Sequence, residues 1–303
     1  MQRVGARVRA GREIIVPASI ANLGPGFDTL GIAVALYLRA RVADVIDDGR
    51  GRLECRFVDG PLGGPNRIET AFKAWPAKGR RRSASLVVDV RSEIPLRSGL
   101  GSSAAATIAG LRLRELIDGR RSTDEILSAA SAIEGHPDNA APALLGGVTS
   151  CCAREDGSIS VTRWPWPARW RIVVATPDAE LRTSVARRAI PRTLPLQDVV
   201  FNTQHLAQLL GALHSGNAAD LREGLRDRVH QPYRERLVPG LRRVLAVRHP
   251  DVIGFCLSGA GPSIAAFTTG KTAAAEKVLR DAYRRQRIAC TVRRVRVHRE
   301  GDA

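Results

Sequence analysis

The first hundred residues are organised by apolar positions that alternate with polar ones or run together in short stretches. Residues 12–28 begin as an apolar stretch and end in a loop rich in glycine and proline, which predicts a strand followed by a tight turn. Residues 32–46 and 83–96 are apolar and partly alternating, a pattern typical of strands. The chain is therefore predicted to begin as a sheet.

Two helices are predicted after a glycine-rich segment near residue 100. Ser102 or Ser103 is expected to cap the first helix, and Gly119 to end it. Its apolar positions recur at helical spacing, at Ala109, Leu113, Leu116 and Ile117. Ser122 and Glu125 form a capping box that predicts a second helix, with Ile126, Ala130 and Ile133 on one face. We expect that helix to end near Glu134, because Gly135 and Pro137 follow.

The second half of the chain mixes strands and helices. Residues 154–170 predict an edge hairpin and a connector, and residues 252–267 predict two strands joined by a glycine turn. Further segments are predicted as a strand at 171–177, helices at 198–215, 218–229 and 272–286, and a last strand at 288–298. This order indicates an α+β protein of two domains, residues 1–165 and 166–303.

Composition narrows the class of protein. Apolar residues make up 44% of the 303 residues, which indicates a folded chain, and no apolar run is long enough to cross a membrane. The basic N-terminus lacks a signal-peptide core because Pro17, Asn22 and Pro25 interrupt it, so we expect a cytoplasmic protein. Five cysteines, an odd number with no C-x-x-C pair, do not favour disulfides or zinc.

A formal net charge of +17 raises the possibility of a nucleic-acid partner. Arginine supplies nearly all of the positive charge and is spread along the whole chain, whereas a nucleic-acid groove needs a concentrated patch. Aromatic residues make up only 4%, so no platform for stacking bases is visible. The sequence therefore does not favour a nucleic-acid-binding function.

The stretch "PLRSGLGSSAAATIAGL" at residues 95–111 carries the chemistry. Glycines let backbone N–H groups approach an anion, and a helix N-terminus directly after them adds unpaired N–H groups. The stretch lacks the lysine of a P-loop, and it only partly matches a dinucleotide-binding fingerprint because Asp118 falls at a helix end. A phosphate cradle and a plain strand-to-helix connection both remain open on spacing alone.

Three motifs resemble those of the GHMP kinases, the family that includes galactokinase, homoserine kinase and mevalonate kinase. They are "VPASIANLGPGFDTLGIAV" (16–34), "PLRSGLGSSAA" (95–105) and "LSGAGPSIAAF" (257–267), in the family's order. The resemblance spans nearly the whole chain. It implies an N-terminal domain like the second domain of ribosomal protein S5, a C-terminal ferredoxin-like domain, and an active site in the cleft between them.

Three segments are similar to the homoserine-phosphorylating members of the family: "ANLGPGFD" (21–28), "EGHPDNAAPALLGG" (134–147) and "HQPYR" (230–234). They imply transfer of the γ-phosphoryl group of ATP to the hydroxyl of L-homoserine, a step of threonine biosynthesis. A kinase of another small alcohol, such as threonine or a mevalonate relative, is the nearer alternative. A basic RNA-binding protein is the more distant one. The family also suggests a homodimer and no membrane partner.

The resemblance assigns residues to the ATP site and its metal ion. The ATP loop consists of Pro95, Leu96, Arg97, Ser98, Gly99, Leu100, Gly101, Ser102, Ser103, Ala104 and Ala105. Adenine is expected near Asn66, and the phosphates are expected to be enclosed by Gly259, Ala260 and Gly261. Mg²⁺ is expected on Ser102 and Glu134, because a cation would offset the cost of an anion in the last turn of a helix.

The implied substrate is a zwitterion, so its pocket needs an acid and one or two arginines. By resemblance, Asn22 and Asp28 would contact its ammonium group, and Arg187 and Arg234 its carboxylate. Thr183, His136 and Asn139 would complete the pocket, with Asn139 lining the reacting atoms. Asp138 is expected to be structural, because phosphoryl transfer depends mostly on positioning and charge neutralisation.

Overall fold

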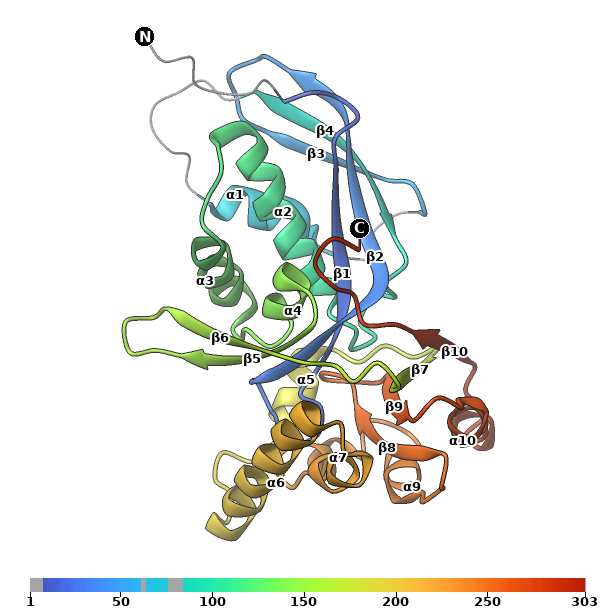
Figure 1. Cartoon of the computed structure of the whole chain (residues 1–303). Coiled ribbons are helices and arrows are strands. Elements are labelled where there is room, and N and C mark those ends of the chain that lie inside the picture. Colours follow the sequence, from blue (N-terminus) through green and yellow to red (C-terminus); the bar gives the residue numbers. More distant parts are fainter. Residues whose placement is uncertain (1–7, 61–63, 76–83, 303) are drawn as a thin grey trace.

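The computed structural model describes residues 8–60, 64–75 and 84–302, and it contains two sheets with helices packed against them (Figure 1). The first sheet has the strand order β3-β4-β2-β5-β6, with β1 paired to β2. Its strands are β1 (Glu13–Ala21), β2 (Leu30–Ile46), β3 (Leu53–Phe57), β4 (Ser85–Ser92), β5 (Val148–Ala153) and β6 (Ile159–Trp164). The strands expected within 12–28, at 32–46 and at 83–96 are present, although residue 83 lies outside the described residues. The edge hairpin expected at 154–170 is formed by β5 and β6 and therefore begins earlier, at Val148.

Strand β2 is the centre of this sheet, because it pairs with β1, β4 and β5. The last six residues of β1 and the first five of β2 are buried, because their apolar side chains are covered on both sides. The loop between them, residues 22–29, holds Asn22, Leu23 and Asp28 at positive φ, which orients these side chains away from the regular strand direction. Short, half-exposed β3 was not predicted, because its five residues bury little apolar surface.

Four helices cover one face of the first sheet (Figure 1): α1 (Arg67–Ala74), α2 (Ser102–Asp118), α3 (Thr123–Glu134) and α4 (Ala140–Leu145). The capping box of α3 is confirmed, as is its end at Glu134 before Gly135 in the left-handed region. Gly119 ends α2 as expected. The expected serine cap of α2 is wrong: Gly101 is its N-cap, and no side chain among the described residues caps it.

The second sheet has the order β10-β7-β9-β8 and is antiparallel throughout. Its strands are β7 (Arg171–Pro177), β8 (Val252–Leu257), β9 (Ile264–Thr268) and β10 (Cys290–Val295). Helices α5 (Thr183–Arg188), α6 (Leu196–Ser215), α7 (Ala218–Gly224), α8 (Gln231–Arg234) and α9 (Leu241–Ala246) lie between β7 and β8, and α10 (Ala273–Arg285) lies between β9 and β10. This strand order within a β-α-β-β-α-β sequence is the ferredoxin-like arrangement that was expected.

Two predicted elements of the second half are too long. The helix expected at 218–229 ends at Gly224, and the carboxylate of Asp227 accepts hydrogen bonds from the backbone N–H groups of the turn before α8. The strand expected at 288–298 ends at Val295, after which the chain leaves the second sheet. The backbone of Arg296 and Val297 then pairs with β2 of the first sheet, so the C-terminus returns to the N-terminal part (Figure 1).

The connector between the sheets explains the "WPWP" segment, which has no role from sequence. The indole of Trp164 donates a hydrogen bond to the hydroxyl of Ser150 at 2.8 Å. Trp166 packs against Trp170 and Phe267, with ring centroids 5.4 and 5.8 Å apart. These aromatic contacts join β6 to the second sheet. Among the described residues, no helix has the length and apolar character needed to cross a membrane.

Candidate active site

The glycine-rich stretch forms a compact turn at the N-terminus of α2. Gly99 and Gly101 have φ values of 81° and 70°, a region that suits glycine because it has no Cβ. With Gly101 as N-cap and no capping side chain from the described residues, the first N–H groups of α2 are left for another acceptor. A turn of this kind followed by a helix N-terminus suits an anion such as a phosphate.

The second glycine loop packs directly on the first. A Cβ at Gly99 would lie 2.4 Å from the carbonyl oxygen of Ser258 and 2.7 Å from that of Gly261, so only glycine fits there. The hydroxyl of Ser258 donates a hydrogen bond to the carbonyl of Gly99 at 2.7 Å. The backbone N–H of Ser263 donates to the carbonyl of Ser98 at 3.0 Å. The loop with Gly259, Ala260 and Gly261 therefore packs against the turn at residues 95–105, the candidate phosphate cradle.

Glu134, from the end of α3, faces the first turns of α2. Its carboxylate accepts hydrogen bonds from the hydroxyls of Ser103 at 3.0 Å and Thr107 at 2.6 Å. The serine in contact with Glu134 is Ser103, whereas the resemblance pairs Glu134 with Ser102. No basic side chain among the described residues forms an ion pair with this half-buried carboxylate. An oxygen-rich anionic group without a cationic partner fits the coordination chemistry of Mg²⁺.

Asn66 is the N-cap of α1. Its side-chain oxygen accepts hydrogen bonds from the N–H groups of Ile68 and Glu69 at 3.1 and 3.3 Å, so this oxygen caps the helix. Leu96, in the cradle, is 52% exposed although it is a large apolar residue. An exposed leucine beside an anion cradle is suited to contact the flat face of a nucleobase.

The expected substrate residues meet in a second, charged cluster. The guanidinium group of Arg187, from α5, forms a bidentate ion pair with the carboxylate of Asp28, with N–O distances of 2.9 and 2.7 Å. By resemblance, these two side chains would bind opposite ends of a zwitterion. In the structure they neutralise one another, and about a third of each side chain is exposed.

Arg234, from α8, is buried in the same cluster. Its guanidinium group donates to the carbonyl of Gly259 at 3.0 Å, to Nδ1 of His230 at 3.1 Å and to the carbonyl of Ala186 at 3.4 Å. Burial, together with the nearby charge of Arg187, lowers the pKa of Arg234 to about 10. No carboxylate of the described chain lies within hydrogen-bonding distance of it, which is costly for a buried cation and favours an anionic ligand.

The aromatic ring of Phe27 packs against the arginines of the charged cluster, a contact that was not predicted from the sequence. Both guanidinium groups, of Arg187 and Arg234, lie over its ring, 5.5 and 5.4 Å from the centroid. Such contacts between a cation and an aromatic face hold guanidinium groups in place. Its position directly before Asp28, in the segment "GPGFD", is the signal that could have identified Phe27.

A chain of polar side chains connects the cluster to the cradle. His136 Nδ1 is hydrogen-bonded to a carboxylate oxygen of Asp138, and the amide of Asn139 donates to the same oxygen at 3.2 Å. The oxygen of Asn139 in turn accepts from the hydroxyl of Ser19 at 2.8 Å. Asn139 also lies next to the cradle, because a Cβ at Gly101 would be 3.0 Å from its oxygen.

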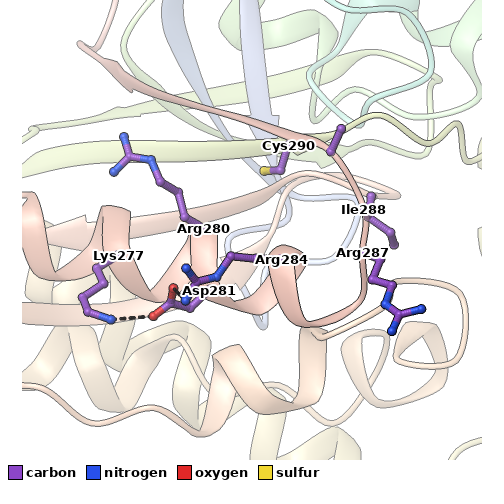
Figure 2. Close-up of a pocket in the computed structure, with 8 residues that line it drawn as sticks. Lys277, Arg280, Asp281, Arg284, Arg287, Ile288 and Cys290 are labelled. Carbon is purple, nitrogen blue, oxygen red and sulfur yellow. Dashed lines mark hydrogen bonds and ion pairs between the residues drawn. The ribbon is translucent and has the colours of Figure 1, made fainter.

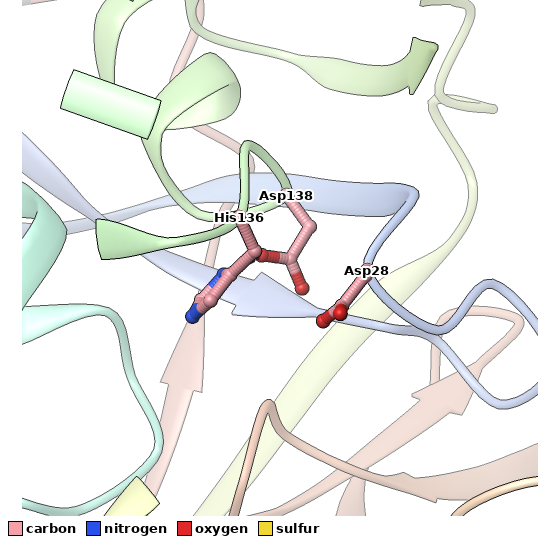
Figure 3. Close-up of side chains that lie close together, drawn as sticks. All are labelled: Asp28, His136 and Asp138. Carbon is pink, nitrogen blue, oxygen red and sulfur yellow. Dashed lines mark hydrogen bonds and ion pairs between the residues drawn. The ribbon is translucent and has the colours of Figure 1, made fainter. Parts of the chain in front are cut away.

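Asp28, His136 and Asp138 come close together at this point (Figure 3), with ligand atoms within 4.8 Å of one another. Such a group could hold a metal ion. However, Asp28 is already paired with Arg187, and His136 with Asp138. The Asp138 hydrogen bond and charge outweigh burial and raise the pKa of His136. Two carboxylates this close together also suit an ammonium group.

The two remaining substrate residues differ in their surroundings. The amide of Asn22 is buried, donating to the carbonyl of Gly259 at 2.9 Å and accepting from the backbone N–H of Asp28 at 3.0 Å. It therefore joins the loop after β1 to the second glycine loop. Thr183 is exposed at the first position of α5, on the same short helix as Arg187.

A groove on the outer side of the second sheet is separate from this site. It has a volume of about 490 Å³ and lies along α10 and the start of β10 (Figure 2). Asp281 pairs there with Lys277 at 2.6 Å and Arg284 at 3.0 Å. The chemistry of the chain is concentrated around the two glycine loops instead.

Comparison with known proteins agrees with this geometry. The GHMP kinases N terminal domain matches residues 66–147, and the GHMP kinases C terminal domain matches residues 209–286. A homoserine kinase of Solibacter usitatus is 40% identical over 256 residues, which are 83% of either chain. A homoserine kinase of Crocosphaera subtropica is 36% identical over 297 residues, covering 95% of this chain and 96% of that one.

The fold is also shared with solved structures. A crystal structure of homoserine kinase from Cytophaga hutchinsonii covers 98% of both chains with a TM-score of 0.80, at 24% sequence identity. This chain therefore belongs to the GHMP kinase family and has its two-domain fold. The chain is accordingly an ATP-dependent kinase of small molecules, and the relatives described above are homoserine kinases of that family.

Proposed function

We propose that this protein transfers the γ-phosphoryl group of ATP to the side-chain hydroxyl of L-homoserine, giving O-phospho-L-homoserine for threonine biosynthesis. The observation that carries the proposal is the charged cluster beside the phosphate cradle. Asp28, Arg187 and Arg234 together offer one anion and two cations around Phe27. An amino acid with a free ammonium group and a free carboxylate complements this set, and a neutral alcohol does not.

Binding of such a zwitterion would replace an ion pair within the protein. The substrate carboxylate would bind Arg234, which has no acidic hydrogen-bond partner in the described chain, together with Arg187. The ammonium group would bind the carboxylate of Asp28 released by Arg187. Asn22 would hold the loop that carries Asp28, and Thr183 and His136 would border the ligand. The hydroxyl would then extend toward Asn139, which adjoins the cradle.

Phosphoryl transfer needs the hydroxyl and the γ-phosphoryl group in line and little other chemistry. Asn139 is proposed to orient the hydroxyl, since its amide lies between the Asp138 carboxylate and Gly101. Asp138 holds His136 and Asn139 in place, and the hydroxyl proton is released to solvent as ADP leaves. Ser102 and Glu134 would hold Mg²⁺, which supplies charge neutralisation on the phosphates when bound. The nucleobase would lie near Asn66.

The proposal includes the organisation of the chain. Residues 1–165 would form the ATP-binding domain and residues 166–303 the second domain, which is supported by each sheet drawing its strands from one side of residue 165. A cytoplasmic location and a homodimer are proposed from the resemblance to soluble biosynthetic enzymes of this family.

A coupled assay of ADP release tests the function. We expect turnover with ATP and Mg²⁺ to depend on L-homoserine and to be at least about tenfold slower with L-threonine, L-serine or mevalonate, because each misplaces the hydroxyl or lacks a charged group. Removing Mg²⁺ with a chelator should abolish the reaction. Turnover with mevalonate but not with homoserine would support the kinase activity and overturn the assignment of homoserine as the substrate. Salt-sensitive RNA binding without turnover would overturn the proposal as a whole.

A further inference from the structure

The buried guanidinium group of Arg234 depends on neutral acceptors for its orientation. Two of its three acceptors are backbone carbonyl groups, of Gly259 and Ala186, and the third is a side chain, His230. A guanidinium group has five N–H donors in a fixed plane. The acceptors that bind some of these donors therefore determine where the remaining donors point, and hence where a carboxylate can bind.

Both ring nitrogens of His230 have a partner with a fixed role. Nε2 lies 2.7 Å from the carbonyl oxygen of Gly24, which can only accept a hydrogen bond. Nδ1 lies 3.1 Å from Nη1 of Arg234, which can only donate one. The imidazole is therefore neutral, with its proton on Nε2. Burial, reinforced by the charge of Arg234, lowers the pKa of His230 and keeps this neutral form, although the charge of Asp227 acts in the opposite direction.

The position of the ring is itself fixed from two sides. The backbone N–H of His230 donates to the buried carboxylate of Asp227 at 3.1 Å, as do those of Val229 and Gln231. The ring stacks on Phe27, with centroids 5.4 Å apart. Because Gly24 and Phe27 belong to the loop that also carries Asp28, His230 connects the anionic and the cationic parts of the substrate site.

We infer that His230 is a positioning residue that aims Arg234 at the substrate carboxylate, with its neutral ring acting as a spacer between Arg234 and the loop at residues 24–28. This inference rests on the proposed function. Its consequence is specific: loss of the acceptor at Nδ1 weakens binding of the amino acid and leaves binding of ATP unchanged. Loss of the donor at Nε2 has the smaller effect, because Asn22 also holds that loop.

Two amide substitutions separate the two ring nitrogens. In His230→Gln, the longer side chain can place an N–H near the carbonyl of Gly24, and the acceptor for Arg234 is lost. In His230→Asn, the shorter side chain can place an oxygen near Arg234, and the contact with Gly24 is lost. We expect His230→Gln to raise the KM for homoserine about tenfold. We expect His230→Asn to raise it less than about threefold, and both variants to keep the wild-type KM for ATP.

A double-mutant cycle with Arg234→Ala identifies the route of the effect. If His230 acts through Arg234, His230→Gln has no further effect on kcat/KM for homoserine when Arg234 is absent. Equal rises in both KM values, equal effects of Gln and Asn, or additivity in the cycle would each overturn the inference. If His230→Gln does not fold, His230→Asn carries the test, and a rise of tenfold or more in its homoserine KM overturns it.

Wild-type protein in the same assay separates this inference from the proposed function. Homoserine-dependent turnover by the wild type, with a normal homoserine KM in His230→Gln, overturns only the role of His230. Absence of homoserine-dependent turnover in the wild type overturns the proposed function and the role of His230 together.

Discussion

The nucleotide half and the substrate half of the proposed active site are built in different ways. The nucleotide half consists mainly of backbone: two glycine loops in contact, and the N-terminus of α2 with no capping side chain from the described chain. The substrate half consists of charged side chains, and two of them, Asp28 and Arg187, form a bidentate ion pair with each other. One half is ready to receive an anion, whereas the other has to exchange partners when the ligand binds.

This difference has a physical origin. Backbone N–H groups in a fixed turn cannot move to satisfy one another, so the cradle keeps its donors free for phosphate. Long charged side chains can rotate and pair, and in a half-buried setting they do so because an isolated charge is costly. The cradle should therefore be sensitive to shape, and the charged cluster to the removal of individual charges.

The largest expected effect comes from adding one methyl group to the cradle. In Gly101→Ala the new Cβ would lie 2.1 Å from the hydroxyl of Ser19 and 3.0 Å from the oxygen of Asn139, at a φ of 70°. Either the turn or the hydrogen-bonded pair of Ser19 and Asn139 must shift, and a shift of about 1 Å in a reacting group costs about 100-fold in rate. We expect kcat to fall by at least about that factor in the ADP-release assay.

Gly119→Ala is the matched control, at the other end of the same helix. Gly119 also has a positive φ, of 96°, but a Cβ there would meet no described atom within 4 Å. We expect Gly119→Ala to lower the free energy of unfolding through backbone strain of about 1–3 kcal/mol and to keep the wild-type KM for ATP. Equal losses of activity in the two variants would mean that strain, and not the shape of the cradle, controls the rate.

An intermediate effect is expected in the substrate half. Arg187→Ala removes a group that would make charge-assisted hydrogen bonds to the substrate carboxylate, each contributing about 1.5–3 kcal/mol. The KM for homoserine should rise about 10- to 100-fold, with the KM for ATP unchanged. The neighbouring Arg188→Ala is the control, because Arg188 is exposed on the same short helix. A normal homoserine KM in Arg187→Ala would remove Arg187 from the carboxylate site.

The same contrast explains what could be predicted from the sequence. The cradle depends on local rules: glycines at consecutive turn positions, a helix directly afterwards and a capping box for α3, all of which are confirmed. The prediction of a serine cap at the start of α2 is wrong. Two serines follow Gly101, and capping preferences alone favour a serine, but a serine cap would occupy the N–H groups that an anion needs.

The substrate half could be predicted only as a set of residues. Asp28 and Arg187 are 159 positions apart in the chain, so no local pattern indicates that they touch. The same holds for His230, whose role depends on a carbonyl group 206 residues away. A resemblance to relatives identifies such residues. Which of them pair with one another depends on how the folded chain brings them together.

The smallest expected effect is a dependence of the free energy of unfolding on pH that comes from His136, in the charged half of the site. Burial acts to lower the pKa of His136, but the hydrogen bond and charge of Asp138 outweigh it and raise the pKa in the folded state. A group whose folded pKa is raised stabilises the protein fully below the unfolded value of about 6.5, and this stabilisation is lost as the pH rises through the folded pKa. In His136→Gln this contribution is absent.

We therefore expect the difference in free energy of unfolding between wild type and His136→Gln to be larger at pH 5.5 than at pH 8.5, as measured by urea denaturation. A constant difference would mean that Asp138 does not hold a proton on His136, and that its contact serves only to orient the ring beside Asn139.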